Sequence, residues 1–467
     1  MSDLLSSVVP PEAAALGELF AAGGHELALV GGPVRDALLR RPVTDLDFTT
    51  DATPQRVLDL VDGWADAVWT IGIEFGTVGL RKGDHQLEVT TYRSESYDPK
   101  SRKPEVSYGT SLVEDLRRRD FAVNAMAWRL GVGEFADPFG GLDDLRARVL
   151  RTPGAPEDSF SDDPLRMMRA ARFVSQLGFT VAAPVEAALR DMADRITIVS
   201  AERVQTELSK LVCGAHPREG LATLVAAGLA EHVLPELPRL RLEIDEHHRH
   251  KDVYEHSLIV LEQAIAQETE GPDLILRLAA LLHDIGKPRT RAFEEGGRVS
   301  FHHHEMVGAK MTRKRLTALR YPKEVIADVS RLVELHLRFH GYGDGEWTDS
   351  AVRRYVRDAG PLLLRLHKLT RADCTTRNKR KAERLSRTYD ALEERIARLE
   401  SEEELGRIRP ELDGVEIQEI LGITPGPQVG RAYKFLLDLR LDQGILGKEA
   451  ATTALVEWAR LNLAEEV

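Results

Sequence analysis

The stretch LVGGPVRDALLRRPVTDLDFTT, residues 29–50, contains two adjacent glycines, a short basic segment and then two aspartates one residue apart. Gly31 and Gly32 allow the backbone to approach a ligand closely, and Pro33 suits the first position of a helix that should run to about Arg40. A helix that starts after glycines offers free backbone N–H groups to a phosphate. The first half of the stretch therefore predicts a turn that binds phosphate groups.

The second half of the stretch carries carboxylates. Asp45 and Asp47, two residues apart in DLDFT, should point to the same side of a strand. Converging carboxylates repel each other unless a cation lies between them, and Mg²⁺ suits this place because it prefers oxygen ligands and substrate phosphates. Glu88, in the later strand QLEVTTY, is a third catalytic candidate, and Arg35 adds a forked cation for the phosphates. These parts predict two-metal nucleotidyl transfer, in which an activated hydroxyl displaces pyrophosphate.

A plainer interpretation exists for the same residues. The glycines can form an ordinary turn, Asp36 can pair with a nearby arginine, and DLDFT can be an edge strand that faces water. The order of the parts, in which one short helix separates the glycine turn from the Asp-x-Asp pair, favours the nucleotidyl-transfer site.

Length and composition limit the class of protein. The chain has 467 residues, of which 43% are hydrophobic, and a net charge of −12. Domains of roughly 100–200 residues are typical, so we expect three or four. We find no basic start followed by an apolar run and no stretch of about 18 apolar residues, so we expect a cytoplasmic protein with no membrane segment. The distant Cys213 and Cys374 fit a reducing compartment and form no metal pattern.

The apolar spacing changes once along the chain. Residues 1–150 mix short strand-like runs (LALV, DLDFT, TVGL, LEVTTY) with helical spacing, which predicts an α+β domain. After the turn-rich segment RTPGAPEDS at 151–159 the spacing is helical, with breaks near 235–250 and 385–410. We therefore expect an α+β head followed by an almost entirely helical remainder.

Basic residues gather in three places although the chain as a whole is acidic. The net charge should repel a polyanion, so binding to a nucleic acid would have to use local surface. For any one cluster, a solvated helix face is the simpler interpretation. The clusters comprise Lys100, Arg102, Lys103 and Arg117 to Arg119; Lys310, Arg313, Lys314 and Arg315; and Arg365, Lys368, Arg371, Arg377, Lys379, Arg380 and Lys381.

Further motifs follow the opening stretch in order. RRDFAVNAMAW at 118–128, ADPFGGLDDL at 136–145 and DDPLRMMRAARF at 162–173 come after GGPVRD and DLDF. Together they resemble the signature motifs of the class II nucleotidyltransferases, the family of tRNA CCA-adding enzymes and bacterial poly(A) polymerases. The resemblance covers about 1–215 and implies a head similar to DNA polymerase β, followed by a helical neck. Segment 94–116 is similar to the family's flexible catalytic loop, which would close over the nucleotide.

The resemblance also implies roles for individual residues. Asp45 and Asp47 would hold the metals, and AERVQTEL at 201–208, which resembles the last neck motif, would act as scaffolding. The residues that would contact the incoming nucleotide are Gly31, Gly32, Arg35, Arg119, Asp120, Asn124, Asp163, Arg166 and Arg169.

The start of DDPLRMMRAAR is the candidate for choosing the base without a template. Asp163 and Arg166 should share a helix face, where a carboxylate that accepts and a guanidinium that donates can mimic the edge of a base. The family uses Glu-Asp-x-x-Arg to select CTP and ATP, whereas this chain has Asp162 in the first position. The alternative is ordinary helix-start chemistry, with Ser161 as N-cap and Pro164 in the first turn.

A second group of candidate metal ligands lies in the helical half of the chain. A histidine, a His-Asp pair in LLHDIGKP and a later aspartate have the order of an HD domain. Such donors can hold a transition metal or Mg²⁺, which acidifies a water for phosphoester hydrolysis. Whether the site is active stays open, because a motif does not prove a function. The residues are His256, His283, Asp284 and Asp373, with His304 and His336 as further ligands if two metals bind and Lys287 as a phosphate contact.

The segment beyond residue 410 is similar to the tail of bacterial CCA-adding enzymes that carry an HD domain, and its PGPQVG turn would orient two helices. The resemblance then extends over nearly the whole chain. A basic helical face from Arg365 to Arg387 would contact tRNA phosphates. The expected domains are the catalytic head at 1–150, the neck with the base-selecting helix at 151–240, the HD domain at 241–390 and the helical RNA-binding tail at 391–467.

The predicted function is the addition of CCA to tRNA 3′ ends from CTP and ATP, with release of pyrophosphate. Related alternatives are CC-only, A-only or poly(A) addition. A phosphohydrolase that works at the HD site belongs to another class, and a non-catalytic RNA-binding protein is a third alternative, against which the Asp-x-Asp pair argues. The expected cofactors are Mg²⁺ and a second divalent or transition metal in the HD domain, and the sequence predicts no oligomeric state.

Overall fold

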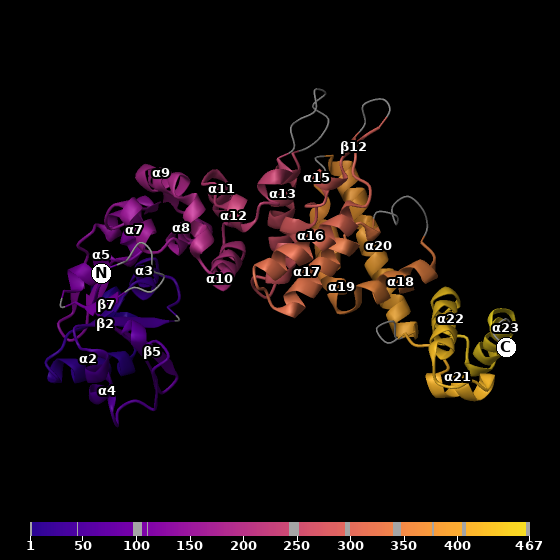
Figure 1. Ribbon diagram of the computed structural model, residues 1–467, viewed down its shortest axis with the longest axis horizontal. Helices are drawn as coiled ribbons and strands as arrows, with labels where there is room; N and C mark the ends of the chain where they lie inside the picture. Colours follow the sequence, from indigo (N-terminus) through magenta and orange to yellow (C-terminus); the bar gives the residue numbers. More distant parts are fainter. Residues whose placement is uncertain are drawn as a thin grey trace. The chain divides into compact units, whose positions relative to one another are not determined.

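The computed structural model forms two compact units, Met1–Pro235 and Glu236–Val467, coloured along the sequence in Figure 1. Each unit is considered by itself. The structure describes residues 2–43, 45–96, 105–109, 111–241, 252–294, 299–339, 347–375, 378–403 and 408–463. Among the helices in these ranges, none is long and apolar enough to cross a membrane.

A mixed sheet forms the centre of the first unit. Its strands lie in the order β3-β4-β5-β2-β1-β8-β9, in which β2 and β5 are parallel and all other neighbours are antiparallel. Their bounds are β1 (Leu27–Val30), β2 (Leu46–Thr50), β3 (Ala67–Trp69), β4 (Thr77–Lys82), β5 (His85–Thr91), β8 (Ala127–Arg129) and β9 (Glu134–Ala136). The apolar run LALV is buried along its whole length, as expected for a strand inside a sheet. Each of the four predicted strand-like runs contains a strand, and the α+β head is confirmed, but Asp45 lies directly before β2 and so does not share the strand with Asp47 as predicted.

Short helices surround this sheet. α3 follows β1 directly, and the 3-10 turn η2 precedes β8. The predicted end of α3 near Arg40 is wrong, because the helix ends at Leu38 and Arg40 adopts a left-handed backbone with φ of 55°. The bounds are α1 (Ser2–Ser7), α2 (Pro11–Ala22), α3 (Gly32–Leu38), α4 (Pro54–Val61), η1 (Ile73–Phe75), α5 (Leu112–Arg117), η2 (Ala122–Asn124) and α6 (Gly141–Ala147).

The segment expected to be a flexible loop, 94–116, belongs only in part to the described residues. β6 (Arg93–Ser96) and β7 (Glu105–Tyr108) pair in antiparallel fashion, and α5 follows them. Residues 97–104 and 110 lie outside the described ranges, and with them Lys100, Arg102 and Lys103 of the first basic cluster. Closure of the loop over a nucleotide stays a prediction.

Helices complete the first unit, and α8 packs against both α10 and α11. Asp163 and Arg166 do not share one helix face as predicted, because α7 ends at Asp162 and α8 begins at Leu165. Pro164 disfavours helical backbone at the residue before it, and Asp163 is extended, with φ of −141° and ψ of 100°. The bounds are α7 (Pro156–Asp162), α8 (Leu165–Leu177), α9 (Ala183–Asp191), η3 (Ala193–Ile198), α10 (Ala201–Val212), α11 (Pro217–Ala226) and α12 (Ala230–Val233).

The second unit is built from helices around the apolar helix α14, whose sequence LILRLAALL is buried over most of its length against α13, α17 and α19. The helical remainder is confirmed, with two short additions, the pair β10 (Val149–Leu150) and β11 (Thr180–Val181) in the first unit and the hairpin β12 (Ala292–Phe293) and β13 (Val299–Ser300) in the second. The helices are α13 (Val253–Ile265), α14 (Leu274–Leu282), α15 (Lys287–Thr290), α16 (His304–Ala318), α17 (Lys323–Leu335), α18 (Asp349–Ala359), α19 (Leu363–Asp373) and α20 (Lys379–Glu403).

The last three helices, α21 (Gly414–Leu421), α22 (Pro427–Gln443) and α23 (Lys448–Asn462), form a tail with a small core of its own. α21 starts with a capping box, in which Asp413 and Glu416 each accept a hydrogen bond from the other's backbone N–H. The buried members of the core are Leu412, Ile417, Ala432, Leu436, Ala451 and Leu455. Pro425 and Gly426 of the predicted PGPQVG turn lie between α21 and α22, and the rest of the motif, 427–430, forms the first turn of α22.

Candidate functional site

A cavity of about 630 Å³ in the first unit is lined by residues of α3, β2, α8 and α10. Eight basic side chains and four carboxylates contribute to its wall, so the cavity attracts anions. The lining includes every predicted head and neck residue except Glu88, namely Gly31, Gly32, Arg35, Asp45, Asp47, Arg119, Asp120, Asn124, Asp163, Arg166 and Arg169.

Glu88 borders a second cavity of about 270 Å³, which Asp47 also lines. The two carboxylates come together because Asp47 on β2 lies directly opposite Glu88 on its parallel neighbour β5. Burial, Glu88 and Asp45 raise the pKa of Asp47, and Arg119 opposes them only in part. These carboxylates form a set of oxygen donors whose mutual repulsion a divalent cation would relieve.

The glycine turn makes room for an arginine. Gly31 has a positive φ of 76°, and a Cβ atom there would lie 2.9 Å from Nη1 of Arg119. On α3, the Arg35 guanidinium donates to both carboxylate oxygens of Asp36, at 3.0 and 2.7 Å, and to Oδ1 of Asn124 at 2.7 Å. The Arg35–Asp36 pair of the plainer interpretation is therefore present, and its arginine also lines the cavity.

Asp120 connects the RRDFAVNA motif to α8. Its carboxylate accepts hydrogen bonds from Asn124 Nδ2 at 2.9 Å and from Arg169 Nε at 2.7 Å, and it also caps the backbone N–H of Phe121 at 2.8 Å. Burial disfavours the charged carboxylate, but Arg169 and Asn124 outweigh burial and hold the pKa of Asp120 below its usual range. Asp120 is therefore a charged residue that orients Asn124 and Arg169.

Phe173, which the motif analysis did not single out, is a contact shared by three arginines of the wall. The guanidinium carbons of Arg172, Arg35 and Arg169 lie 4.2, 5.2 and 5.5 Å from its ring centroid. These distances lie within the range of cation–π attraction. Burial and the neighbouring Arg169 charge lower the pKa of Arg172 to about 10, so it still carries its charge at neutral pH.

Asp163, between α7 and α8, and Arg166, in the first turn of α8, line the same cavity. Asp163 Oδ1 caps the Leu165 backbone N–H at 3.1 Å, and Oδ2 accepts from Arg203 at 2.8 Å. Arg166 donates to Ser159 Oγ at 2.9 Å and to the Arg118 carbonyl at 2.5 Å. Asp162, the residue that departs from the family pattern, is not among the described residues that line the cavity.

The sequence analysis missed the contribution of α10, which it assigned to scaffolding. Arg203 and Lys210 of this helix line the cavity, and Glu207 between them pairs with Arg172 at 3.0 Å. The spacing i, i+4, i+7 placed these three charged residues on one helix face and was the signal that could have been used.

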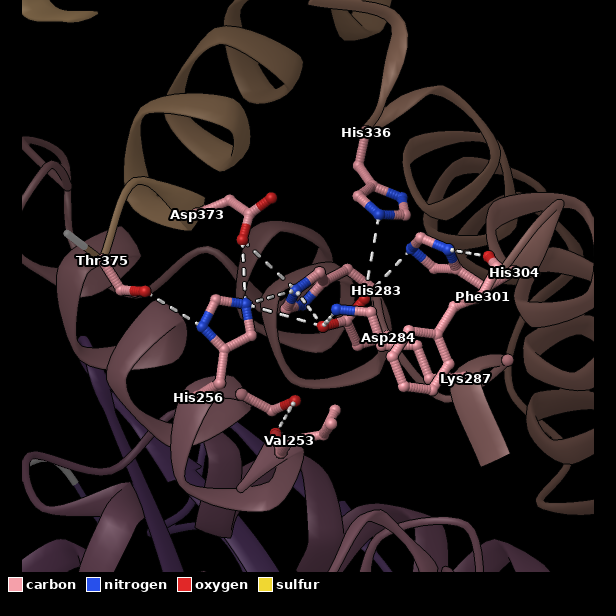
Figure 2. Close-up of polar contacts among 12 residues, drawn as sticks. Val253, His256, His283, Asp284, Lys287, Phe301, His304, His336, Asp373 and Thr375 are labelled. Carbon is pink, nitrogen blue, oxygen red and sulfur yellow. Dashed lines mark hydrogen bonds and ion pairs between the residues drawn. The ribbon is translucent and has the colours of Figure 1, made fainter. Parts of the chain in front are cut away.

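A second site lies in the second unit, where the six predicted HD residues converge, as Figure 2 shows. One group consists of His256, His283 and Asp373, whose candidate donor atoms all lie within 4.8 Å of one another. The Nε2 atoms of His256 and His283 lie 2.9 and 3.5 Å from Asp373 Oδ1.

The other group consists of Asp284, His304 and His336. Oδ1 of Asp284 lies 3.2 Å from His304 Nε2 and 4.0 Å from His336 Nε2. Its Oδ2 lies 3.2 Å from His283 Nε2, so the carboxylate reaches both groups. Lys287 also donates to Oδ2, at 2.6 Å (Figure 2).

Backbone carbonyls orient three of the four histidines of this site. Nδ1 of His283 lies 2.8 Å from the Ala280 carbonyl, Nδ1 of His304 lies 2.8 Å from that of Phe301, and Nδ1 of His336 lies 2.6 Å from that of Val333. An Nδ1–H that donates in this way leaves Nε2 as the lone-pair donor, which is how metal-binding histidines are commonly held.

The charges of this site also suit a metal. Burial opposes charge on His283, but Asp284 and Asp373 outweigh it and raise the pKa of His283 to about 10. Burial and the charge on His283 lower the pKa of His336 to about 3. His336 is therefore neutral, and a cation in the first group would take the place of the proton on His283.

Comparisons with known proteins match the head and the HD segment of this chain. Residues 27–151 match the poly A polymerase head domain, 178–240 the probable RNA and SrmB-binding site of polymerase A, and 253–378 the HD domain. An A-adding tRNA nucleotidyltransferase of Deinococcus radiodurans is 36% identical over 443 residues, which cover 92% of this chain and 95% of the relative. A CCA-adding enzyme of Bacillus subtilis is 38% identical over 262 residues, 56% of this chain and 62% of the relative.

Solved structures give the same result. The Bacillus stearothermophilus CCA-adding enzyme in complex with CTP superposes with a TM-score of 0.71 at 25% identity and covers 97% of this chain and 98% of its own. The Thermotoga maritima CCA-adding enzyme complexed with tRNA has the same fold, with a TM-score of 0.61 at 17% identity over 98% of both chains. From its near full-length relative and its matched domains, the chain belongs to the class II tRNA nucleotidyltransferase and poly(A) polymerase family.

Proposed function

We propose that this protein completes the 3′ ends of tRNA with CCA, using CTP and ATP and releasing pyrophosphate. The observation that carries the proposal is the large cavity, in which Asp45 and Asp47 share one wall with an excess of basic side chains. The carboxylates suit metal-dependent phosphoryl transfer, and the arginines suit a triphosphate. The CCA-adding enzymes named above support CTP and ATP as the substrates.

Mg²⁺ is the cofactor proposed for this cavity. Asp45, Asp47 and Glu88 offer carboxylate oxygens, and the pKa of Asp47 is raised first by burial and then by the negative charges of Glu88 and Asp45. When bound, such ions activate the attacking hydroxyl and neutralise charge on the leaving pyrophosphate.

The reaction forms one bond and breaks one. The terminal hydroxyl oxygen of the RNA attacks the α-phosphorus of the nucleotide, its proton passes to water, and the bond from the α-phosphorus to the bridging oxygen of pyrophosphate breaks. Arg35, Arg119 and Arg169 hold the phosphates, and the glycine turn lets the backbone approach them. Asp120 and Asn124 keep two of these arginines in place and contact the sugar.

Asp163 and Arg166 choose the base. The phosphates are common to all nucleotides, so selection needs groups that differ in their response to the base edge. The Asp163 carboxylate accepts hydrogen bonds and the Arg166 guanidinium donates them, which suits the amino group and ring nitrogen that cytosine and adenine share.

The test is to sequence the 3′ ends of three tRNA transcripts, lacking CCA, ending in C and ending in CC, after incubation with the protein, Mg²⁺, CTP and ATP. Ends that finish in CCA from all three transcripts are the expected result. Asp45→Asn serves as the control and should leave every transcript unextended. Unextended ends with the wild-type protein would exclude the proposal.

A-only addition is the rival that this assay separates. The Deinococcus radiodurans relative, which aligns with 92% of this chain, is named an A-adding enzyme. A protein of that kind would extend only the transcript that ends in CC.

We propose phosphoester hydrolysis at the HD site as a second function. The observation behind this proposal is that Asp284 contacts histidines of both groups of candidate metal ligands, His283 in one and His304 in the other. Imidazole donors favour a transition metal over Mg²⁺, and a bound metal would acidify a water. Metal-free protein reloaded with Mn²⁺, Ni²⁺ or Mg²⁺ should hydrolyse a chromogenic phosphodiester, most strongly with the transition metals. No hydrolysis with any of the three would exclude this function.

A further inference from the structure

The segment 306–323, which begins inside α16 directly after the first-turn acid Glu305, is basic and contains no acidic residue. Its net charge opposes that of the whole chain, which is −12. Residues 306–323 include no Asp or Glu and six basic residues, Lys310, Arg313, Lys314, Arg315, Arg320 and Lys323.

Three of these bases share one exposed face of the helix. Lys310, Arg313 and Lys314 have the spacing i, i+3, i+4, which brings their side chains together. The opposite face of α16 is buried through Gly308, Ala309, Thr312 and Leu316. Arg320 and Lys323 extend the exposed basic surface past the end of the helix. We refer to these five exposed bases as the α16 face.

The charges of the α16 face have no partner among the residues that the structure describes. Within the ranges that the structure describes, none of its five side chains makes an ion pair or a hydrogen bond. Arg315, which points elsewhere, is bound by both carboxylate oxygens of Glu236, at 2.8 and 3.1 Å. Like charges one helical turn apart destabilise a helix by about 0.2–0.5 kcal/mol per pair, so an external anion would relieve the α16 face.

The basic face predicted from the sequence, Arg365 to Arg387, differs in this respect. Arg365 pairs with Asp273 at 2.7 Å, and Arg371 pairs with Asp390 at 2.8 Å and Glu393 at 3.0 Å. Arg377 lies outside the described residues, and residues 379–387 at the start of α20 carry five bases and one acid. Arg365 and Arg371, in the first part of this face, are therefore neutralised within the protein.

We propose that the α16 face binds the phosphate backbone of the tRNA. The inference rests on the tRNA substrate of the proposed function. Helical residues rise about 1.5 Å each, so Lys310, Arg313 and Lys314 span about 6 Å along the axis, enough to contact neighbouring phosphates. Lysines and arginines on exposed flexible arms give contacts that do not depend on base sequence, as an enzyme acting on many tRNAs requires.

The test compares two triple variants of the full chain. Lys310→Gln with Arg313→Gln and Lys314→Gln removes three charges from the α16 face. The control, Arg146→Gln with Arg190→Gln and Arg338→Gln, removes the same charge from arginines that are 68, 54 and 55% exposed and paired with acids. The Kd for tRNA is measured between roughly 50 and 200 mM salt, where phosphate contacts dominate.

The α16 variant should lower the slope of log Kd against log salt by about 2 to 3, because each lost phosphate contact removes about 0.7–0.9. Its KM for ATP and its melting temperature should match those of the wild type, and the control should change the slope by less than one unit. An unchanged slope, or an equal fall of the slope in both variants, would overturn the proposal that the α16 face binds tRNA. The proposed function would still stand in that case, provided that the wild-type protein adds nucleotides to tRNA. A wild type that neither binds nor extends tRNA would overturn both.

Discussion

Phe173 contacts three arginines of the cavity wall, for two of which, Arg35 and Arg169, we propose phosphate binding. Phe173→Leu keeps an apolar side chain but removes the ring that Arg35, Arg169 and Arg172 share. Each cation–π contact contributes about 0.5–2 kcal/mol, so we expect the KM for ATP and CTP to rise about tenfold with a smaller change in kcat. Steady-state kinetics on a tRNA transcript measures both values.

The control for this prediction is Phe121→Leu. Phe121 is also buried and packs edge-to-face on Phe173, with ring centroids 5.7 Å apart. Among the described residues, no guanidinium lies over its ring. It should lower the melting temperature without raising KM, and Phe173→Tyr should retain the wild-type KM. An equal rise in KM for Phe121→Leu and Phe173→Leu would show that Phe173 acts only as core.

The raised pKa of Asp47 leads to a prediction about the stability of the metal-free protein and its dependence on pH. Because its pKa is raised in the folded state, its ionised form destabilises the metal-free fold above that pKa, and the cost disappears as the pH falls below the unfolded value of about 3.9. In EDTA at neutral pH, Asp47→Asn should raise the melting temperature by about 2 °C, and the gain should vanish near pH 4. Calorimetry with and without Mg²⁺ should show that only the wild type gains stability from the metal. A lower melting temperature of the variant in EDTA would contradict this prediction.

At the scale of elements, α10 holds Asp163, the carboxylate that we propose selects the base. Arg203→Gln removes the donor to Asp163 Oδ2, so the carboxylate gains rotational freedom. We expect misincorporation of UTP and GTP to rise about tenfold, equivalent to about 1.4 kcal/mol of lost discrimination, which a competition assay with all four nucleotides measures. Arg195→Gln is the matched control, because Arg195 donates to the nearby Ser161 carbonyl at 3.2 Å and is not among the cavity-lining residues. Equal misincorporation in both variants would exclude this role of α10.

The sequence could predict the elements that local contacts determine. It could not predict features that depend on contacts between distant parts of the chain. The run LALV and the Asp-x-Asp strand were predictable because burial and period fix them locally. The break between α7 and α8 was missed because helical spacing on both sides concealed the effect of Pro164 on Asp163. The cavity roles of Arg203 and Phe173 were missed because contacts with residues far along the chain create them.

At the scale of the whole molecule, the two sites should be separable by mutation, since each lies within one compact unit. Asp45→Ala should abolish nucleotide addition and spare hydrolysis of the chromogenic phosphodiester, and His283→Ala should do the reverse. Parallel assays of both activities on each variant measure this. Loss of both activities in either variant, with an unchanged melting temperature, would contradict independence.

The order of the motifs was sufficient to predict the fold class of the whole chain. GGPVRD and DLDF predicted the α+β head, and the HD pair, which follows them along the chain, predicted the helical HD domain. The sequence could not show which basic cluster is free. Arg365 and the bases of the α16 face look alike in the sequence, and only the fold brings Asp273 to Arg365. Charge pairing between distant segments is invisible to pattern analysis.

The tail has a consequence for how such chains diversify. Its apolar side chains pack among themselves, and polar contacts join α22 to α18, including Ser350 with Asp442 at 2.7 Å and Arg353 with the Leu441 carbonyl at 3.1 Å. Substitutions inside the tail core can compensate one another locally, and the polar junction needs only a few matching residues. The tail of such a chain can therefore change in evolution while the first unit, with its cavity, stays the same.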